Sequence, residues 1–492
     1  MAVPAPATIG GAGRGAMVSV PSFTTARSGL AKARTHGRIT EEHGGGSGPP
    51  APGPAAASRV PRSDIPDRTM INGLLALLAG AVLPGGPNEP PPYEFPPVEK
   101  LPDQEGMPDP FRMHDGSRVA TRGDWARQRH YLKAMLAHYQ YGHMPPRPRK
   151  LDVKQTSSRA VFDGKATEIR LTVTIRRGGG RVSLRVGLIR PAGAGPFPVV
   201  IKNDRGLFDR PEDKRSRKSF LTEQAAVREA VGRGYVICKY IRTDLADDER
   251  GKRSRGVFPL YPEYDWGVIA AWAWGYQIVI DALSPLGFAD MDKIVVTGHS
   301  RGGKTALCGA IYDERIAIAA PNSSGTGGTG SLRYFEKGQR PQTIAAHVGR
   351  HDHWWTPRFL TFANREAKLP FDAHFAKALI APRGLVNPHA LQDYWANPYG
   401  TQLTHQGARV VFDWLGVGGH IGIHWRPGGH AQGAEDWRAL IDFAEQYFFQ
   451  KDVQRKFNVL PYPDAKVPMT WKAPAAPPAG THLTFPERTD GP

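Results

Sequence analysis

Short apolar runs, each bounded by turn residues, recur along the middle of the chain. They lie at residues 197–202, 235–240, 294–297 and 316–320. Runs of this length that are rich in β-branched residues are typical of strands buried on both faces of a parallel sheet. Between them, residues 266–283 and 304–312 contain few helix breakers and are predicted to be crossover helices. Strands that alternate with helices indicate a doubly wound α/β sheet.

Two stretches of alternating apolar and polar residues precede these runs. Residues 167–175 and 181–189 flank the three consecutive glycines 178–180, which predicts an antiparallel hairpin. We expect these to be the first two strands of a mostly parallel sheet. Farther along, residues 382–387 are predicted to be the seventh strand and 421–425 a late one, followed by a helix over 434–449.

The N-terminal part of the chain has a different composition. Residues 1–69 are rich in Gly, Ala, Pro, Ser and Arg and are predicted to be a disordered low-complexity segment. Residues 70–83 resemble a signal peptide: Arg62 and Arg68 precede the apolar stretch, and Ala79 and Ala81 fit a cleavage pattern. If Met70 is the true start, the first 69 residues are an artefact and the protein is secreted or periplasmic. The alternative is a short apolar helix packed on the body.

The remaining boundaries follow from proline content. Residues 84–100 are predicted to be a Pro-rich linker, 101–470 the main folded domain and 471–492 a Pro-rich tail. No run of 18 or more apolar residues occurs, which argues against a polytopic membrane protein.

Charge and cysteine content narrow the classes of function. The 492 residues include 64 Lys and Arg against 46 Asp and Glu, a formal charge of +18 that favours polyanionic partners in general. The basic residues are scattered among acidic ones, so we predict no nucleic-acid partner. Two cysteines, Cys238 and Cys308, provide neither a disulfide scaffold nor a thiolate zinc site. We expect both to be buried free thiols.

The motif with the clearest chemistry is Gly298-His-Ser300-Arg-Gly302, which joins a predicted strand to a predicted helix. A serine nucleophile needs a strained strand-to-helix turn flanked by small residues. The N–H of Arg301, at the start of the helix, would then stabilise an oxyanion. A plain glycine-rich turn is the alternative, but the flanking strand and helix favour Ser300 as a nucleophile.

The partners of such a serine follow it along the chain, the acid after a late strand and the histidine after the last one. His430 lies in a glycine-rich loop just after the apolar run 421–425, and we predict it as the general base. His424 lies within that run and is predicted to be a packed strand residue. Asp393 follows the strand at 382–387 and is the predicted acid; Asp372 precedes that strand and is the weaker choice. A solvated loop carboxylate is the alternative for Asp393.

Several blocks together resemble the glucuronoyl esterases, carbohydrate esterase family 15, over about residues 101–449. They lie at residues 298–304, 324–328, 369–374, 378–383, 393–398 and 428–430. The resemblance implies an α/β-hydrolase fold and metal-free, cofactor-free cleavage of glucuronoyl esters between xylan and lignin alcohols. It implies Ser300 and His430 as nucleophile and base and Arg301 in the oxyanion hole. It also implies substrate contacts from Lys304, Trp395 and Gln342.

The chain departs from this family in two places. Many members carry the catalytic acid as a Glu two residues before the glycine that here is Gly325, whereas this chain has Ser323. Asp393 must then serve as the acid. In addition, residues 336–355 contain an apparent insertion with His347, His351, Asp352 and His353, whose spacing does not put them on one face of a helix or strand, so we predict no metal site there.

The sequence therefore predicts a serine esterase of the α/β-hydrolase fold that acts on glucuronoyl or 4-O-methyl-glucuronoyl esters of a plant-type polysaccharide. We expect a monomer without a cofactor and without stable membrane insertion. Two other hypotheses stay open. One is a carboxylesterase or acetyl esterase acting on another polysaccharide or small ester, and the other is a catalytically impaired carbohydrate-binding relative that keeps the fold.

Overall fold

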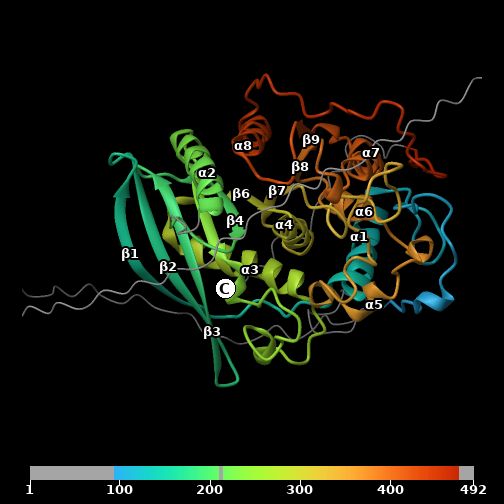
Figure 1. The fold of residues 1–492 in the computed structure, drawn as a ribbon, viewed down its shortest axis with the longest axis horizontal. Coiled ribbons are helices and arrows are strands. Elements are labelled where there is room, and N and C mark those ends of the chain that lie inside the picture. Colours follow the sequence, from blue (N-terminus) through green and yellow to red (C-terminus); the bar gives the residue numbers. More distant parts are fainter. Residues whose placement is uncertain (1–92, 210–213, 476–492) are drawn as a thin grey trace, which may run out of the picture. The chain divides into compact units, whose positions relative to one another are not determined.

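A computed structural model describes residues 93–209 and 214–475 of the chain (Figure 1). Within these residues, one sheet of nine strands runs in the order β1-β2-β3-β5-β4-β6-β7-β8-β9. The strands are β1 Asp152–Val161, β2 Ala166–Arg177, β3 Gly180–Pro191, β4 Phe197–Asp204, β5 Val236–Ile241, β6 Ala289–His299, β7 Ile316–Asn322, β8 Gly384–Ala390 and β9 Ile421–Arg426. From β5 to β9 all neighbours are parallel, whereas β1, β2 and β3 pair antiparallel. This is the predicted α/β-hydrolase type of sheet.

Helices cover both faces of the sheet. They are α1 Arg122–Leu136, α2 Lys214–Gly232, α3 Val268–Leu283, α4 Arg301–Tyr312, α5 Pro357–Leu360, α6 Ala373–Ala378, α7 Pro398–Trp414 and α8 Ala434–Phe449. In Figure 1, α2 and α8 lie on one side of the central strands and α3, α4 and α1 on the other. The predicted crossover helices and the helix over 434–449 are therefore present.

The core consists of two layers, one on each face of the sheet, because strand side chains alternate between faces. Val199 and Ile201 of β4 pack into the larger cluster with α3, whereas Val200 packs with α2 and α8. All three are fully buried, which is why the sequence of the run is continuously apolar. Both cysteines are buried and free, as predicted, and burial raises the pKa of the Cys238 and Cys308 thiols.

The predicted hairpin is β2 and β3, paired from Ala166 opposite Pro191 to Arg177 opposite Gly180. The prediction that these are the first two strands was wrong, because β1 precedes them and pairs with β2. Nearly every side chain of β1 is exposed, so this strand has no buried apolar face and no alternating pattern. The predicted seventh strand, residues 382–387, is β8, the eighth along the chain and shifted two to three residues later.

The folded body extends beyond the predicted boundaries at both ends. In the predicted linker, Val98 is buried and the carbonyl of Pro96 accepts a hydrogen bond from Tyr139 at 2.5 Å. In the predicted tail, Trp471 is buried and donates from Nε1 to the carbonyl of Met107 at 2.7 Å. Residues 93–100 and 471–475 therefore pack on the domain. Residues 1–69 and the apolar segment 70–83 lie outside the described residues.

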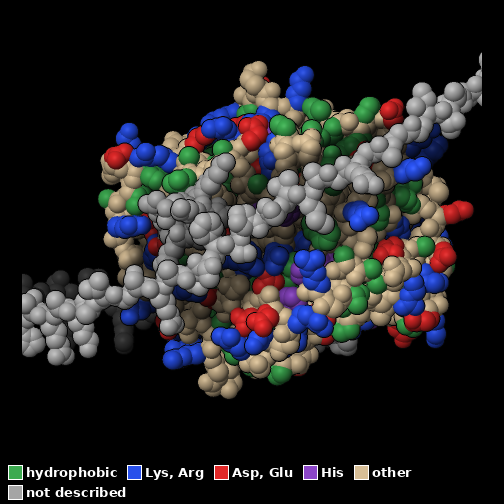
Figure 2. All heavy atoms as spheres, in the orientation of Figure 1, with side chains coloured by type: hydrophobic (Ala, Val, Ile, Leu, Met, Phe, Trp, Pro, Cys, Tyr) green, Lys and Arg blue, Asp and Glu red, His purple; other side chains and the backbone are tan. Residues whose placement is uncertain are grey.

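Two observations bear on membrane and polyanion partners. In the part of the chain that the structure describes, no helix is long and apolar enough to span a bilayer. On the face seen in Figure 2, Lys and Arg side chains lie interspersed with Asp and Glu rather than in one block.

Candidate active site

Ser300 occupies the sharp turn between β6 and α4. Its backbone has φ 58° and ψ −119°, a positive φ that L-residues rarely adopt. The turn is held by the Ser300 N–H, which donates to the carbonyl of Asn322 at 3.0 Å, and by the Lys304 N–H, which donates to the Ser300 carbonyl at 3.1 Å. Strain that the surrounding structure maintains at one serine is the arrangement expected of a nucleophile.

The small residues beside Ser300 are required by close packing. A Cβ atom at Gly298 would lie 2.4 Å from the carbonyl oxygen of Gly302, and one at Gly302 would lie 2.8 Å from Oδ1 of Asn203. Asn203, at the end of β4, also donates from Nδ2 to the Gly302 carbonyl at 2.8 Å. Strand and helix thus meet at a distance that excludes side chains at both positions.

Asp393 and His430 meet at the carboxyl edge of the sheet. Nδ1 of His430 lies 2.7 Å from Oδ2 of Asp393, whose side chain is 1% exposed, while that of His430 is 37% exposed. Burial alone would raise the pKa of Asp393, but the hydrogen bond and charge of His430 outweigh it and lower the pKa below its usual value. The carboxylate therefore stays charged at neutral pH, and Nε2 is the ring nitrogen of His430 left for other partners.

The loops that carry these two residues are joined beyond the ends of β8 and β9. The Leu391 N–H donates to the carbonyl of Arg426 at 2.9 Å, and the Gln392 N–H donates to the carbonyl of Gly428 at 3.1 Å. The parallel pairing of β8 with β9 ends at Ala390 opposite Arg426, so the two loops emerge side by side. This explains why residues 37 positions apart come into contact.

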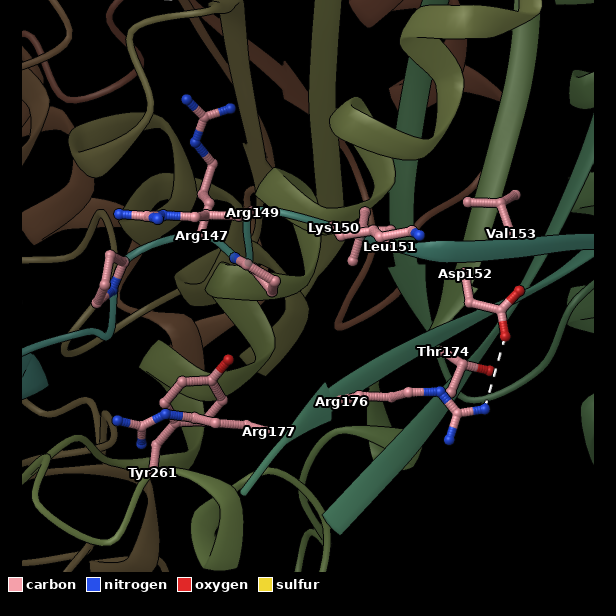
Figure 3. A pocket seen from close by; sticks show the side chains of 12 residues that line it. Arg147, Arg149, Lys150, Leu151, Asp152, Val153, Thr174, Arg176, Arg177 and Tyr261 are labelled. Carbon is pink, nitrogen blue, oxygen red and sulfur yellow. Dashed lines mark ion pairs between the residues drawn. The ribbon is translucent and has the colours of Figure 1, made fainter. Parts of the chain in front are cut away.

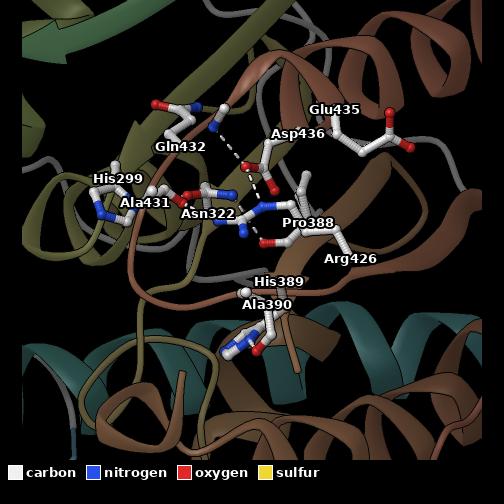
Figure 4. A network of polar contacts seen from close by, with 12 residues as sticks. His299, Asn322, Pro388, His389, Ala390, Arg426, Ala431, Gln432, Glu435 and Asp436 are labelled. Carbon is white, nitrogen blue, oxygen red and sulfur yellow. Dashed lines mark hydrogen bonds and ion pairs between the residues drawn. The ribbon is translucent and has the colours of Figure 1, made fainter. Parts of the chain in front are cut away.

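Arg426 supports the loop of the general-base candidate. Its guanidinium donates to the carbonyls of Gly429 at 3.2 Å and Ala431 at 2.5 Å, on either side of His430. It also pairs with Asp436 at 2.7 Å, and the same carboxylate oxygen accepts the Gly433 N–H at 2.7 Å at the start of α8 (Figure 4). The loop conformation is thereby fixed by charge-assisted hydrogen bonds.

His299, the residue before the nucleophile candidate, packs against His430. The ring centroids lie 4.4 Å apart, and Nδ1 of His299 lies 2.6 Å from Oδ1 of Asn322. Burial and the neighbouring charge of His430 lower the pKa of His299 to about 3, so its ring is neutral over the ordinary pH range. The contact between these two rings shows that the Ser300 turn and the His430 loop adjoin each other. The described residues contain no hydrogen bond between the Ser300 hydroxyl and His430.

Lys304, a predicted substrate-binding residue, is buried with its ammonium among oxygen acceptors. Nζ donates to the carbonyls of Ser324 at 2.5 Å and Thr326 at 2.7 Å, and to Oε1 of Gln342 at 3.2 Å. Burial and the charge of Arg301 lower the pKa of Lys304 to about 7. Its three N–H groups are thus occupied within the protein, where they organise the loop that follows β7.

Gln342 and Trp395 adjoin this loop. Gln342 is buried, and its backbone N–H donates to the carbonyl of Trp395 at 3.0 Å. Trp395 is 41% exposed, so its ring is accessible from solvent. The structure brings these two residues and Lys304 into one connected group.

The alternatives considered from the sequence have other roles in the structure. Asp372 is fully buried and caps α6, accepting from the N–H of Leu332 at 2.8 Å and the hydroxyl of Ser331 at 2.8 Å. His424 lies in β9, as predicted, 3.3 Å from Glu435. Ser323, at the position where the family resemblance led us to expect an acid in many members, is buried, and its hydroxyl has no hydrogen-bond partner among the described residues.

Sequence reasoning missed Asn203, Arg426 and Asp436, which hold the turn and the base loop. No catalytic motif marks them. Asn203 contacts a segment 99 positions away, whereas Arg426 and Asp436 contact each other and the backbone of the base loop. For Asn203 and Arg426 the one available signal was their position at the ends of β4 and β9, where parallel sheets place functional groups, whereas Asp436 lies in the first turn of α8.

A cavity of about 730 Å³ lies elsewhere, beside the end of β2 (Figure 3). Its lining includes Arg147, Arg149, Lys150, Arg176 and Arg177. Arg147 pairs with Asp281 at 2.8 Å and Arg177 with Glu263 at 2.6 Å, and Figure 3 shows Arg149 and Lys150 pointing in opposite directions. These cations do not converge on one point, and the lining contains no candidate nucleophile and base in contact.

Within residues 93–209 and 214–475, no group of three or more His, Cys, Asp or Glu side chains is arranged to hold a metal ion. The His-rich run packs instead with aromatic rings: His347 lies 5.4 Å from Trp355 and His351 stacks on Trp354 at 4.2 Å between centroids.

Comparison with known proteins identifies the family. A family model described as glucuronyl esterase, fungi, matches residues 173–416, which include the Ser300 turn and Asp393. The chain belongs to the glucuronoyl esterase family. This assignment agrees with the resemblance of the motif blocks and with the fold.

Individual glucuronoyl esterases and related carbohydrate esterases match over most of the folded domain. The carbohydrate esterase MZ0003, from an unknown prokaryotic organism, is 29% identical over 391 residues, 69% of this chain and 89% of its own length. A 4-O-methyl-glucuronoyl methylesterase of Podospora anserina is 31% identical over 321 residues, 63% of this chain and 60% of its own length. A family 15 glucuronoyl esterase structure from Caldicellulosiruptor kristjansonii has a TM-score of 0.64 at 29% identity, covering 77% of this chain and 99% of that one.

Proposed function

We propose that this protein is a serine esterase that hydrolyses glucuronoyl or 4-O-methyl-glucuronoyl esters through an acyl-enzyme on Ser300. The observation that carries the proposal is the 2.7 Å contact of His430 with the buried Asp393, beside the strained turn of Ser300. The substrate class is supported by the relatives, among them a 4-O-methyl-glucuronoyl methylesterase at 31% identity.

In the proposed first step, Nε2 of His430 takes the proton of the Ser300 hydroxyl while Oγ bonds to the ester carbonyl carbon. Asp393 stabilises the imidazolium and fixes the ring so that Nε2 faces the serine. The bond to the alcohol then breaks, and the alkoxide leaves with the proton of the imidazolium. A water molecule then gives a proton to His430 and attacks the acyl carbon in the same way, which releases the glucuronic acid and restores Ser300.

The negative charge that develops on the carbonyl oxygen requires donors fixed in advance. The backbone N–H of Arg301 is the first of α4 and has no acceptor within the helix. In the proposal this N–H and the Arg301 guanidinium bind the oxyanion. Donors of this kind act most strongly when they need no rearrangement during the reaction.

For the sugar, we assign the exposed ring of Trp395 to contact with the glucuronoyl moiety. Lys304 and Gln342 form the polar wall next to it. The 3.2 Å contact between them is the longest of the three made by the Lys304 ammonium, so a sugar hydroxyl would displace it at least cost. The alcohol half of the ester needs no dedicated contact.

The test is hydrolysis of a benzyl glucuronate ester by the wild type and by Ser300→Ala. The wild type is expected to release benzyl alcohol and the variant to release none above background. Undiminished turnover by Ser300→Ala would exclude the mechanism.

The rival acetyl esterase hypothesis predicts a different preference among substrates. An enzyme that hydrolyses nitrophenyl acetate and leaves benzyl glucuronate intact would support it. The impaired-relative hypothesis rested on Ser323, but Asp393 supplies a carboxylate to His430 without an acid at that position. A chain that fails to react with a fluorophosphonate probe would revive it.

We also propose that the protein is exported and monomeric. Export rests on the signal-peptide-like composition of residues 70–83. N-terminal sequencing of protein recovered from the culture medium or periplasm tests it, with a start shortly after Ala81 as the expected result. Size-exclusion chromatography with light scattering tests the monomer.

A further inference from the structure

Asp248, in the segment after β5, places a buried carboxylate against the side chain of Arg301. Nη1 of Arg301 forms an ion pair with Oδ2 of Asp248, and the guanidinium lies 4.7 Å from the ring centre of Trp354. The Asp248 side chain is 7% exposed and that of Arg301 is 29% exposed. The guanidinium is therefore held on one side by a charge and on another by an aromatic face.

Both oxygens of Asp248 are fully engaged. Oδ2 also accepts a hydrogen bond from Nη2 of Arg205 at 3.0 Å. Oδ1 accepts from Nε1 of Trp354 at 2.9 Å and lies 3.4 Å from Nε2 of His353. A carboxylate with donors on both oxygens has one orientation, and Arg301 is bound to that orientation.

His353 and Trp354 belong to the His-rich segment 347–355, within the apparent insertion. A second set of contacts ties this segment to the same loop as Asp248. Arg250 pairs with Asp352 at 3.0 Å and donates to the carbonyl of Gly349 at 2.7 Å. The two segments therefore lock together beside Arg301, and the His-rich run acquires a role that its spacing did not suggest.

The charge of Asp248 is maintained by its surroundings. Burial alone would raise its pKa, but the hydrogen bond from His353 and the charge of Arg301 bring the pKa well below the usual value. A hydrogen bond between two charged groups is roughly twice as strong as one between neutral groups. Arg301 directly follows Ser300 in the chain, so the orientation of its guanidinium bears directly on the oxyanion site.

We propose that Asp248, itself held by His353 and Trp354, is a positioning residue that fixes the Arg301 guanidinium for the oxyanion of the ester reaction. This inference rests on the proposed serine mechanism. It does not depend on which ester is the substrate, so it can be tested with a reagent that needs only the nucleophile and the oxyanion site.

The experiment is a double-mutant cycle on the rate at which a fluorophosphonate modifies Ser300. In that reaction Oγ bonds to phosphorus while Nε2 of His430 takes the hydroxyl proton, the P–F bond breaks and fluoride leaves. The phosphoryl oxygen occupies the oxyanion position. Asp248→Asn keeps the shape and removes the charge, and we expect the rate to fall about 10- to 100-fold. The labelling rate of Arg301→Met is expected to fall at least as far. The double variant should lie within about threefold of Arg301→Met, because Asp248 acts through Arg301.

Asp247→Asn is the matched control, since this neighbouring carboxylate faces Arg255 at 3.3 Å instead of Arg301. It should keep the wild-type rate, and melting temperatures establish that each variant is folded. If Asp248→Asn does not fold, Trp354→Phe removes one donor to Asp248 and is expected to slow labelling about 3- to 10-fold.

An unchanged or raised rate in Asp248→Asn, or independent effects that multiply in the double variant, would overturn the positioning role and leave the serine mechanism standing. A wild-type chain that is not labelled at Ser300 would overturn both.

Discussion

The Nδ1 atom of His430 lies 2.7 Å from Oδ2 of Asp393, at the ends of two loops that hydrogen-bond to each other beyond β8 and β9. The acid is almost fully buried and the base is partly open to solvent, so the pair has a protected side and a reactive side. A histidine that acts as a general base needs this arrangement, with a fixed carboxylate on one side of the ring and access for substrate on the other.

Asp393→Asn is expected to lower kcat by up to about 10⁴-fold, because the amide no longer stabilises the imidazolium and permits the wrong tautomer. The measurement is turnover of benzyl glucuronate, with the melting temperature as a check of folding. A loss below about tenfold would assign the acid role to another group.

Asp372, the other acid considered from the sequence, is expected to affect stability rather than catalysis. Its carboxylate accepts from Leu332 and Ser331 in a fully buried position, so Asp372→Asn should cost about 1–3 kcal/mol of unfolding free energy. Urea unfolding measures this cost. The folded variant should keep kcat within about threefold of the wild type, and a far larger kcat loss at unchanged stability would contradict the assignment.

Gly298→Ala tests the packing of the nucleophile turn. The new Cβ would lie 2.4 Å from the Gly302 carbonyl oxygen, so the backbone must shift at a cost of about 1–3 kcal/mol. We expect lower stability and slower fluorophosphonate labelling together. Gly419→Ala is the control, because no atom lies within 4 Å of the position that its Cβ would take and φ is not positive. Its effect on stability should stay within about 0.5 kcal/mol.

His299 makes a prediction about pH. Its pKa is lowered to about 3 in the folded protein, whereas an unfolded chain titrates His near about 6.5. Between these values the unfolded state binds more protons, so this residue's effect on stability grows less favourable as pH falls below about 6.5.

Replacing His299 by Gln removes that titration. The loss of unfolding free energy between pH 7 and pH 5 should then be smaller than in the wild type, by as much as about 2 kcal/mol. Urea unfolding at the two pH values is the measurement. An equal loss in both proteins would show that the ring is not held neutral.

The buried strands and the Ser300 turn could be predicted because their causes are local. Val199, Val200 and Ile201 must be apolar to fill both core layers, and the glycines beside Ser300 reflect contacts within a few residues. His430 and Asp393 could be ranked by their positions after strands, since parallel strands end at one edge of a sheet.

The features that could not be predicted depend on contacts between segments far apart in the chain. Asp248 reaches Arg301 and Trp354 across 53 and 106 positions, and a cluster of acidic residues such as 247–249 is typical of solvated surface in a sequence. Val98 and Trp471 likewise become buried only once the domain has formed around them. The prolines near both residues led the sequence analysis to predict a linker and a tail, and so this packing was not foreseen.

The outermost strand, β1, leaves one border of the sheet without a neighbouring strand among the described residues. Its backbone groups on that side are free to pair with another extended chain, the usual route by which β-proteins stick to one another. Lys154 is exposed on this strand, and a charged side chain at a sheet edge disfavours the addition of another strand. The polar character that hid β1 from sequence analysis is therefore of the kind that protects an open sheet edge from further strand pairing.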